Sequence, residues 1–308
     1  MVSSFSQAFP PAPTFTEKNV RNLSGATFIV TGAASGVGYE LAKILYSKGG
    51  NIYVAARSPD KVNRAIKSIQ DGTPESRGQL HPLILDLSDF PSIKKAANQF
   101  LERESRLDVL VHNAGLMTPP AGSVNKTGHD LEMATNCLGP FILNQLLEPL
   151  MVRTAQQGGT SRPDGVRIVW VSSMLTALVP AGGIQFDEKS GSPRVLKNAM
   201  NNYMQTKVGN LFLASEEAKR VGKDGVLSLS IIMGLLFKPP LFGAYSELFA
   251  ALSPDVTSKN NGDFIIPWGR FGDLPEQLEN GLKSKAEGGT GVAGQFWSWC
   301  VRETQEYV

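Results

Sequence analysis

The sequence predicts an α/β fold in which helices cover both faces of a mostly parallel sheet. Short apolar runs rich in β-branched residues alternate with longer amphipathic patterns from residue 26 onward. Such alternation is typical of parallel strands joined by right-handed helical crossovers. A glycine-rich turn joins the first of these strands to the first helix. No change of composition interrupts the alternation, so we expect one domain with three layers.

The predicted strands are short and apolar at nearly every position, as expected for strands that are covered on both faces. They occupy residues 27–31, 51–55, 83–87, 109–112, 166–171 and 227–232. A final apolar segment, residues 264–267, is a candidate seventh strand. The expected sheet is therefore seven-stranded.

The segments between the strands have the periodicity of helices. We expect helices at residues 36–48, 59–70, 89–103, 131–151 and 200–220, and a C-terminal helix at residues 294–307. Asp89 and Pro91 begin the third of these patterns, and an acidic residue followed by proline is typical of a helix start.

Composition excludes several classes of protein. Of the 308 residues, 42% are apolar, which is too many for a disordered chain. Lys and Arg number 30 against 28 for Asp and Glu, so the chain lacks the basic excess of a nucleic-acid binding protein. Its 2 cysteines cannot build a disulfide framework, which favours a reducing compartment. The His and Cys residues lack ligand spacing, so we expect no metal site.

The chain ends and the apolar runs indicate where the protein resides. Residues 1–22 are predicted to be a tail rich in Ser and Pro near its start, and residues 23–308 to be the domain. The tail lacks the basic and apolar regions of a secretory signal. The longest apolar stretch, residues 226–237, is too short to span a bilayer. We therefore expect a cytoplasmic protein with no membrane span.

The glycine-rich turn after the first strand has the features of a phosphate-binding loop. Gly32, Gly36 and Gly38 lie in the sequence TGAASGVG, between the strand and the helix. Glycine permits the tight turn and the close approach of backbone to a pyrophosphate. The helix N-terminus offers unpaired N–H groups to an anion. The alternative is a glycine-rich turn that binds nothing.

The residue after the second strand discriminates between the two nicotinamide cofactors. NAD-binding proteins place an acid there to accept from the ribose 2′-hydroxyl. This chain has Arg57, whose guanidinium suits a 2′-phosphate. Ser35 and Lys61 are further candidates for contact with that phosphate. We therefore expect NADP(H) as cofactor, the alternative being that Arg57 lies in solvent at the edge of the sheet.

A candidate acid/base pair lies in the predicted helix at residues 200–220. Tyr203 and Lys207 are four residues apart and so share one helix face. A nearby ammonium should lower the pKa of Tyr203 from its ordinary value of about 10, which would allow proton exchange near neutral pH. Ser172 and Ser173 end the fifth strand, at the edge of the sheet where the glycine loop also lies.

Together these motifs resemble those of the short-chain dehydrogenase/reductase family. The resemblance extends over residues 25–234 and includes the glycine loop, the turn Asn113-Ala114-Gly115, Asn136, Ser173, and Tyr203 with Lys207. It implies a Rossmann-type single domain and hydride transfer at a nicotinamide. The arginine position, the long gap between Ser173 and Tyr203 and the C-terminal tryptophans are similar to the retinol-dehydrogenase-like branch, fungal type.

The resemblance also implies residue roles. Tyr203 would be the general acid/base, Ser173 rather than Ser172 would position the substrate carbonyl, and Lys207 would hold the nicotinamide ribose. Asn136 would hold a water that relays protons to Lys207. The implied catalytic residues are Asn136, Ser173, Tyr203 and Lys207. The implied cofactor-binding residues are Gly32, Ser35, Gly36, Val37, Gly38, Arg57, Asp86, Leu87, Asn113, Ala114, Gly115, Tyr203 and Lys207.

Two stretches depart from the family pattern or allow two interpretations. Met233 and Lys238 stand where the family usually has a proline and a threonine that binds the carboxamide of the nicotinamide. Residues 235–262 lie where the family has its substrate lid. Their apolar side chains would form either the wall of a pocket for a bulky substrate or part of the core.

The sequence thus predicts an NADP(H)-dependent carbonyl reductase or alcohol dehydrogenase acting on a hydrophobic ketone, aldehyde or alcohol, such as a secondary-metabolite intermediate. One alternative is a non-redox biosynthetic enzyme, a dehydratase, isomerase or cyclase, on the same scaffold. Another is a cofactor-sensing protein without catalysis, which the catalytic set argues against. The helical pattern at residues 140–151 would form either core or, as often in the family, a homodimer interface.

Overall fold

A single eight-stranded sheet forms the centre of the protein in a computed structural model that describes residues 9–157, 165–180, 182–233 and 238–308. The strand order is β3-β2-β1-β4-β5-β6-β7-β8. Strands β1 to β7 pair in parallel, and β8 pairs with β7 in the antiparallel direction. The strands are β1 (Thr27–Thr31), β2 (Asn51–Ala56), β3 (Gln79–Ile84), β4 (Val109–His112), β5 (Val166–Ser173), β6 (Val226–Met233), β7 (Phe264–Ile266) and β8 (Arg270–Phe271).

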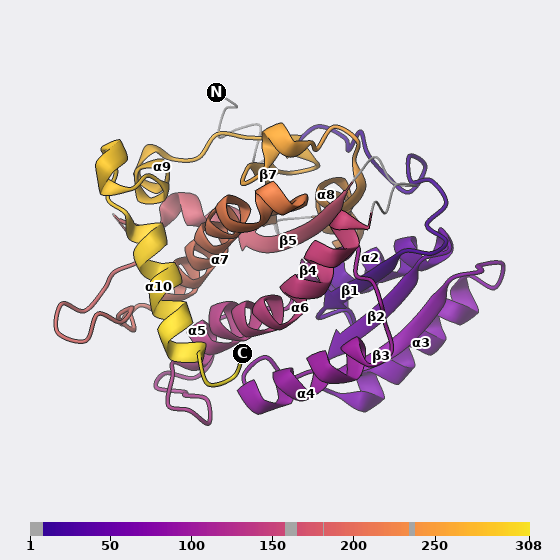
Figure 1. Cartoon of the computed structure of the whole chain (residues 1–308), viewed down its shortest axis with the longest axis horizontal. Coiled ribbons are helices and arrows are strands. Elements are labelled where there is room, and N and C mark those ends of the chain that lie inside the picture. Colours follow the sequence, from indigo (N-terminus) through magenta and orange to yellow (C-terminus); the bar gives the residue numbers. More distant parts are fainter. Residues whose placement is uncertain (1–8, 158–164, 181, 234–237) are drawn as a thin grey trace.

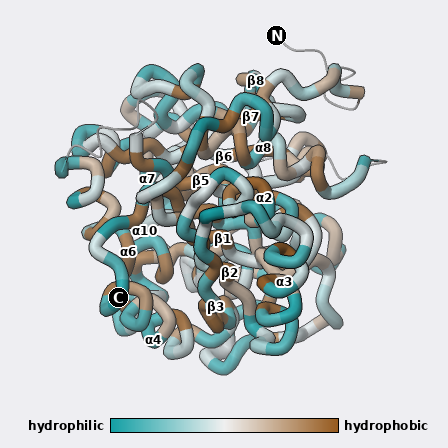
Figure 2. The backbone as a smooth tube through the Cα atoms, turned by 90° about the vertical axis from the view of Figure 1, so that its right-hand side faces the viewer, coloured by the Kyte–Doolittle hydropathy of each residue, from teal (hydrophilic) through white to brown (hydrophobic). Residues whose placement is uncertain are grey.

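Helices cover both faces of this sheet (Figure 1). One face carries α2 (Gly36–Ser47), α3 (Pro59–Gly72) and α8 (Pro240–Leu252); the other carries α4 (Phe90–Leu101), α6 (Gly139–Gln156) and α7 (Ala199–Val221). Two hydrophobic clusters fill the two interfaces, and hydrophobic segments follow the strands in the interior (Figure 2). The predicted three-layer α/β fold is confirmed.

Shorter elements complete the chain. They are α5 (Leu131–Met133), the π-helical turn η1 (Ala134–Leu138), α9 (Glu276–Leu282), α10 (Val292–Thr304) and the 3-10 turns η2 (Met174–Leu178), η3 (Gly222–Asp224), η4 (Ser258–Asn260) and η5 (Lys285–Glu287). The helix predicted at residues 131–151 is thus interrupted by a π turn, a feature that is frequent at functional sites.

Local sequence explains where the helices begin. Ser58 caps α3 by accepting a hydrogen bond from Lys61 N, and Pro59 occupies the first turn, where its missing N–H costs nothing. Asn198 caps α7 in the same way through Asn201 N. These caps set the start of the helix next to the expected cofactor phosphate and of the helix that carries Tyr203.

The structure differs from the predicted strands in two places. β3 begins at Gln79 instead of residue 83, because this edge strand is half-exposed and includes Pro82, so apolarity does not mark it. Leu85 and Leu87 are buried but follow the strand. The seven-strand prediction also missed β8, whose two residues are too short to show a pattern.

The predicted tail and the predicted lid segment, for which core packing was one of the two interpretations, both contribute to the core. Within the predicted tail, Phe15 and Val20 are buried, and Phe15 contacts Phe249 of α8 edge to face. Within the predicted lid, residues 235–237 lie outside the described residues, and α8 packs on α2, β5 and β6 with Leu248 in the core. Core packing therefore accounts for most of α8, while Pro240 and Gly243 at its start line a cavity.

One buried cation connects the sheet to α8. Arg167 of β5 is 0% exposed and donates hydrogen bonds to the carbonyl oxygens of Ala250, Ser253 and Val256 at 2.8 to 3.0 Å. The last carbonyls of a helix have no intrahelical donor, so this guanidinium satisfies groups that burial would otherwise leave unpaired.

We expect Arg167→Met to lower the free energy of unfolding by about 3 kcal/mol, because it keeps the volume of the side chain but removes every donor. Chemical denaturation measures the change. Arg153→Ala, on the exposed face of α6, is the control and should change stability little. Equal stability of the two variants would show that the α8 contacts of Arg167 contribute nothing.

Candidate active site

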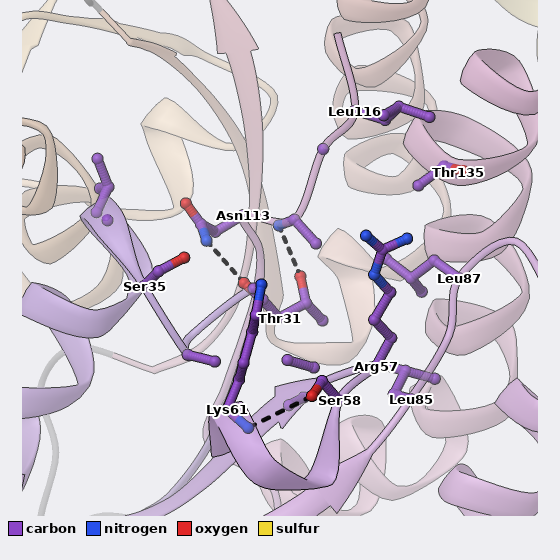
Figure 3. A pocket seen from close by; sticks show the side chains of 18 of the residues that line it. Thr31, Ser35, Arg57, Ser58, Lys61, Leu85, Leu87, Asn113, Leu116 and Thr135 are labelled. Atoms are coloured by element: carbon purple, nitrogen blue, oxygen red, sulfur yellow. Dashed lines mark hydrogen bonds between the residues drawn. The ribbon is translucent and has the colours of Figure 1, made fainter. Parts of the chain in front are cut away.

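A cavity of about 710 Å³ opens at the carboxyl edge of the sheet, where the strand order changes direction between β1 and β4. Ligands of open α/β sheets bind at this switch point. Figure 3 shows the pocket between these strand ends. Its lining includes most of the predicted cofactor-binding residues, namely Gly32, Ser35, Gly36, Val37, Arg57, Asp86, Leu87, Asn113, Ala114 and Gly115. Gly38 is buried behind the loop.

The glycine loop has the backbone that its sequence predicts. Gly32 and Gly36 have φ of 71° and 61°, a region that L-residues with side chains rarely adopt. A Cβ on Gly36 would meet no atom within 4 Å, so the loop is open to the cavity there. Ser35 is the N-cap of α2, yet its side chain makes no capping bond and is exposed. The loop and the helix N-terminus therefore leave donors available for phosphate.

The turn after β4 is fixed to β1 by its own hydrogen bonds. Asn113 Nδ2 donates to the carbonyl oxygen of Thr31 at 2.7 Å, and Ala114 N donates to Thr31 Oγ1 at 3.0 Å (Figure 3). Cβ atoms on Gly32 and Gly38 would lie 2.9 and 2.5 Å from Asn113 Nδ2. Glycine is therefore required at both positions to leave space for this amide.

Two basic side chains extend into the cavity from the end of β2 and the start of α3. Arg57 and Lys61 are exposed residues of its lining, and Figure 3 shows both reaching into the pocket. On the same side, Asp86 Oδ1 accepts hydrogen bonds from Ser88 N and Ser88 Oγ at 2.9 and 2.7 Å. Arg57 and Lys61 thus present positive charge to an anionic group, and the fixed carboxylate of Asp86 lies in the same lining.

Ser173, Tyr203 and Lys207 lie together beyond the Gly115 end of the cavity. Lys207 Nζ lies 5.8 Å from the centroid of the Tyr203 ring and donates to the carbonyl oxygen of Val171 at 3.0 Å. Of the two serines at the end of β5, Ser173 is the one whose side chain acts on the Tyr203 phenol, and it lowers the pKa of that group. The hydroxyl of Ser172 instead donates to the carbonyl oxygen of Lys207 at 2.8 Å. Only Ser173 is therefore available to Tyr203.

The structure reverses the predicted direction of the Tyr203 pKa. Burial raises the pKa of Tyr203, the side chain of Ser173 opposes this, and the charge of Glu132 adds to the rise. Burial also lowers the pKa of Lys207 to about 8. The prediction considered only the attraction between an ammonium and a phenolate. It omitted desolvation, which favours the neutral form of both groups.

Asn136 lies in the π turn η1 and is 0% exposed. Its Oδ1 accepts from Leu116 N at 2.7 Å, and its Nδ2 donates to the Leu116 carbonyl and to Thr206 Oγ1 at 2.8 and 2.9 Å. A Cβ on Gly115 would meet Lys207 Nζ at 3.1 Å and Asn136 Oδ1 at 3.5 Å. Asn136 and Lys207 thus approach the same glycine from two helices.

Both residues that depart from the family pattern line the cavity. Met233 ends β6 and Lys238 precedes α8. The ammonium of Lys238 lies 5.2 Å from the centroid of the Phe242 ring. Residues 234–237 between them lie outside the described residues.

Sequence reasoning missed two residues next to the site. Glu132 is 1% exposed and bonds to Asn202, the residue before Tyr203, with an Asn202 Nδ2 to Glu132 Oε2 distance of 3.0 Å. Glu132 precedes Asn136 by one helical turn and could have been found by that spacing. Nothing in the sequence marks Asn202 as its partner.

Neither a metal-binding cluster nor a membrane-spanning helix occurs in the described part of the chain. There, no group of three or more His, Cys, Asp and Glu side chains is arranged to hold a metal ion. No helix of these residues is long and apolar enough to cross a membrane.

Comparison with known proteins identifies the family. Residues 26–185 match the family model described as short chain dehydrogenase. The chain is 40% identical to the short-chain dehydrogenase/reductase bet4 of Neocamarosporium betae, covering 99% of this chain and 94% of the relative. It is also 40% identical to the short-chain dehydrogenase/reductase iacJ of Pestalotiopsis fici, covering 98% and 97%.

Solved structures share the fold. A protein of Mycobacterium paratuberculosis superimposes with a TM-score of 0.72 at 24% identity, over 94% of this chain and 97% of that one. A metagenomic short-chain oxidoreductase in complex with NADP gives a TM-score of 0.58 at 24% identity, over 76% and 95%. The matched family model and the fungal relatives show that the chain belongs to the short-chain dehydrogenase/reductase family.

Proposed function

We propose that the protein is an NADP(H)-dependent oxidoreductase that transfers hydride to or from a carbonyl or alcohol carbon of a hydrophobic small molecule. The observation that carries the proposal is that Ser173, Tyr203 and Lys207 are grouped next to Gly115, which lines one end of a cavity that also includes Arg57 in its lining. Hydroxyls and an amine at one end suit acid/base chemistry, and a guanidinium at the other suits a phosphate.

The cavity residues fit NADP(H). The open backbone at Gly36 and the unpaired N–H groups of α2 suit a pyrophosphate. Arg57, Lys61 and Ser35 line the same cavity and would hold a 2′-phosphate. The complex of the metagenomic relative with NADP supports this choice of cofactor. When bound, the nicotinamide would supply or accept hydride.

The protein's own residues would handle the proton. In the reductive direction, Ser173 and Tyr203 would both donate hydrogen bonds to the substrate carbonyl oxygen. As the carbonyl carbon gains hydride, the Tyr203 proton would pass to that oxygen and give the alcohol. A raised pKa keeps Tyr203 protonated through neutral pH, which suits a proton donor. Lys207, in its charged form below about pH 8, would stabilise the phenolate that remains.

Exposed apolar side chains support a hydrophobic substrate. Met117 follows the Gly115 turn, Leu178 ends the turn after Ser173, and Met200 precedes Tyr203 by about one helical turn. Large apolar side chains exposed beside a site are typical of a surface that an apolar ligand covers.

Met233 and Lys238 differ from the residues that the family usually has at these positions, and this difference favours a second candidate function. Both residues line the cavity, so the substitutions act within the site. The second candidate is a non-redox biosynthetic reaction, such as dehydration, isomerisation or cyclisation, on the same scaffold. The next experiment distinguishes the two.

Tyr203→Phe should lower the rate of NADPH-dependent reduction of apolar ketones by about 10²- to 10⁴-fold, because it removes the proton donor and leaves the cofactor cavity intact. Absorbance of NADPH measures the rate. Tyr39→Phe is the matched control, since the Tyr39 hydroxyl bonds Ser68 at 2.9 Å and Tyr39 does not line the cavity. Full turnover by Tyr203→Phe would contradict the proposed chemistry and favour the non-redox candidate.

Arg57→Ala should weaken NADPH binding by about 10- to 100-fold and leave NADH binding nearly unchanged, because only NADPH carries the 2′-phosphate. Titration calorimetry with each cofactor measures the two affinities. Arg64→Ala, on the exposed side of α3, is the control. Tighter binding of NADH than NADPH by the unmodified protein would overturn the assignment of Arg57.

A further inference from the structure

Glu132 is a buried carboxylate with two firm partners on two other segments. It lies in α5 and is 1% exposed. Its Oε1 accepts a hydrogen bond from Thr118 N at 2.6 Å, and its Oε2 accepts one from Asn202 Nδ2 at 3.0 Å. Burial raises the pKa of Glu132 above its ordinary value, and the hydrogen bonds from these two donors oppose that rise by favouring the charged carboxylate.

The first partner lies in a strained loop. Thr118 has φ of 47°, and it is the single non-glycine residue with positive φ in the part of the chain that the structure describes. A β-branched residue is unfavourable in this region and persists there only where surrounding contacts hold it. The short bond to Glu132 is such a contact, and it fixes the loop that follows the Gly115 turn.

The second partner fixes the start of the catalytic helix. Asn202 directly precedes Tyr203 and is 6% exposed. Its Oδ1 accepts from Leu196 N at 3.1 Å, and its Nδ2 also contacts Asp130 Oδ1 at 3.3 Å. Through Asn202, Glu132 therefore connects the loop after β4 and the loop before α7 to the turn that carries Tyr203.

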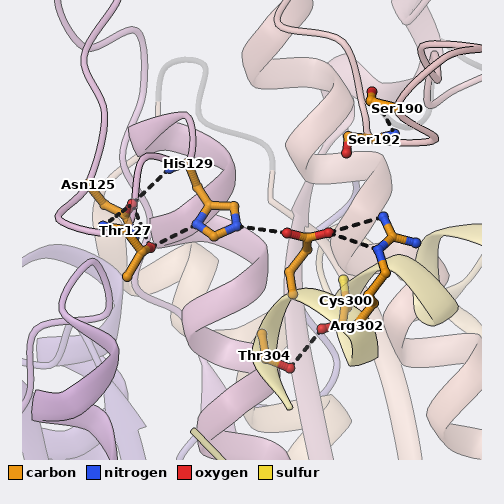
Figure 4. Close-up of polar contacts among 9 residues, drawn as sticks. Asn125, Thr127, His129, Ser190, Ser192, Cys300, Arg302 and Thr304 are labelled. Carbon is orange, nitrogen blue, oxygen red and sulfur yellow. Dashed lines mark hydrogen bonds and ion pairs between the residues drawn. The ribbon is translucent and has the colours of Figure 1, made fainter. Parts of the chain in front are cut away.

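The segment before Glu132 is itself anchored. His129 contacts Thr127 Oγ1 at 2.8 Å and a carboxylate oxygen of Glu303 in α10 at 3.2 Å (Figure 4). Asn125 Oδ1 accepts from Thr127 N and His129 N at 3.1 and 2.9 Å. The segment that leads to Glu132 is thus fixed by contacts of its own. The position of Glu132 therefore does not depend on Tyr203, and Glu132 can constrain the turn that carries Tyr203.

The charge of Glu132 acts on the catalytic pair. Its carboxylate adds to the rise in the pKa of Tyr203 and raises that of Lys207 against the effect of burial. The other titratable groups that face these residues are Asp130, which raises the pKa of Glu132, and Cys137 and Glu247, which raise that of Lys207. Among these carboxylates, only that of Glu132 acts on Tyr203.

We propose that Glu132 is a positioning residue for Tyr203: through its bonds to Thr118 N and Asn202 Nδ2 it fixes the loop after β4 to the first turn of α7. The role rests on the proposed function, because it acts through the residue assigned as proton donor. It also predicts a spectroscopic property of Tyr203 that does not depend on turnover.

The test is a pH titration of tyrosinate absorbance in the absence of substrate. Each protein is compared with its Tyr203→Phe derivative, so that the difference reports Tyr203 alone. Glu132→Gln keeps the acceptor for Thr118 N, removes the charge and places an amide donor where Oε2 accepts from Asn202 Nδ2, so the midpoint of Tyr203 should fall. Glu132→Asp keeps the charge and should retain a midpoint close to that of the parent, while its rate of reduction falls because the shorter side chain cannot reach both partners.

Asp130→Asn is the matched control for charge, because it neutralises a second carboxylate that accepts from Asn202 Nδ2 and from Met133 N but whose charge does not act on Tyr203. Thermal melting of each variant checks folding, and Glu132→Asp carries the test if Glu132→Gln does not fold. An unchanged midpoint in Glu132→Gln, an equal fall in Asp130→Asn, or a fall in Glu132→Asp would overturn the inference. A shifted midpoint together with full turnover by Tyr203→Phe would overturn only the proposed function.

Discussion

The site depends on one hydrogen-bonded connection between β1 and β4. Asn113 Nδ2 bonds the Thr31 carbonyl at 2.7 Å, and Thr31 Oγ1 in turn donates to the Val111 carbonyl at 3.1 Å and accepts from Ala114 N at 3.0 Å. From β1 the sheet continues outward through β2 and β3, and from β4 it continues to the other side through β5 and β6. The bonds between β1 and β4 therefore fix the floor of the crevice at the switch point. Gly32 and Gly38 leave the space that the Asn113 amide occupies. The glycine motif therefore serves the protein's own packing as well as a phosphate.

From this floor, the turn leads through Gly115 to the acid/base pair, where burial decides the electrostatics. Tyr203 and Lys207 are 6% and 4% exposed, and desolvation moves each pKa toward the neutral form. A neutral phenol is the state that a proton donor needs. The carboxylate of Glu132 works in the same direction on Tyr203, while on Lys207 it opposes desolvation and favours the ammonium. One buried acid thus favours the protonated form of both partners.

The sequence predicted what short-range patterns encode. β1 and β4 have the predicted bounds because all their residues are buried, and the spacing of Tyr203 and Lys207 follows from helix geometry. Sequence patterns did not predict the features that tertiary contacts determine. β3 is a half-exposed edge strand, and the direction of the Tyr203 pKa depends on desolvation. For α8, the sequence left pocket wall and core packing both open, and its packing on α2, β5 and β6 decides between them. Glu132 and Asn202 are seventy residues apart in the chain, and only the fold brings them together.

The apolar residues of α6 could form either core or an interface between subunits. Most of them are buried by other parts of the same chain. α10 packs over α7 beside it, and Trp297 contacts Phe141 of α6 edge to face with ring centroids 4.9 Å apart. The other side of Trp297 carries the guanidinium of Arg220 at 4.0 Å from its centroid. Since α10 also provides Glu303 to His129, the C-terminal helix both contacts Phe141 of α6 and fixes the segment that leads to Glu132. The tryptophans near the C-terminus therefore support the active site through packing, and α6 needs no second subunit to bury Phe141.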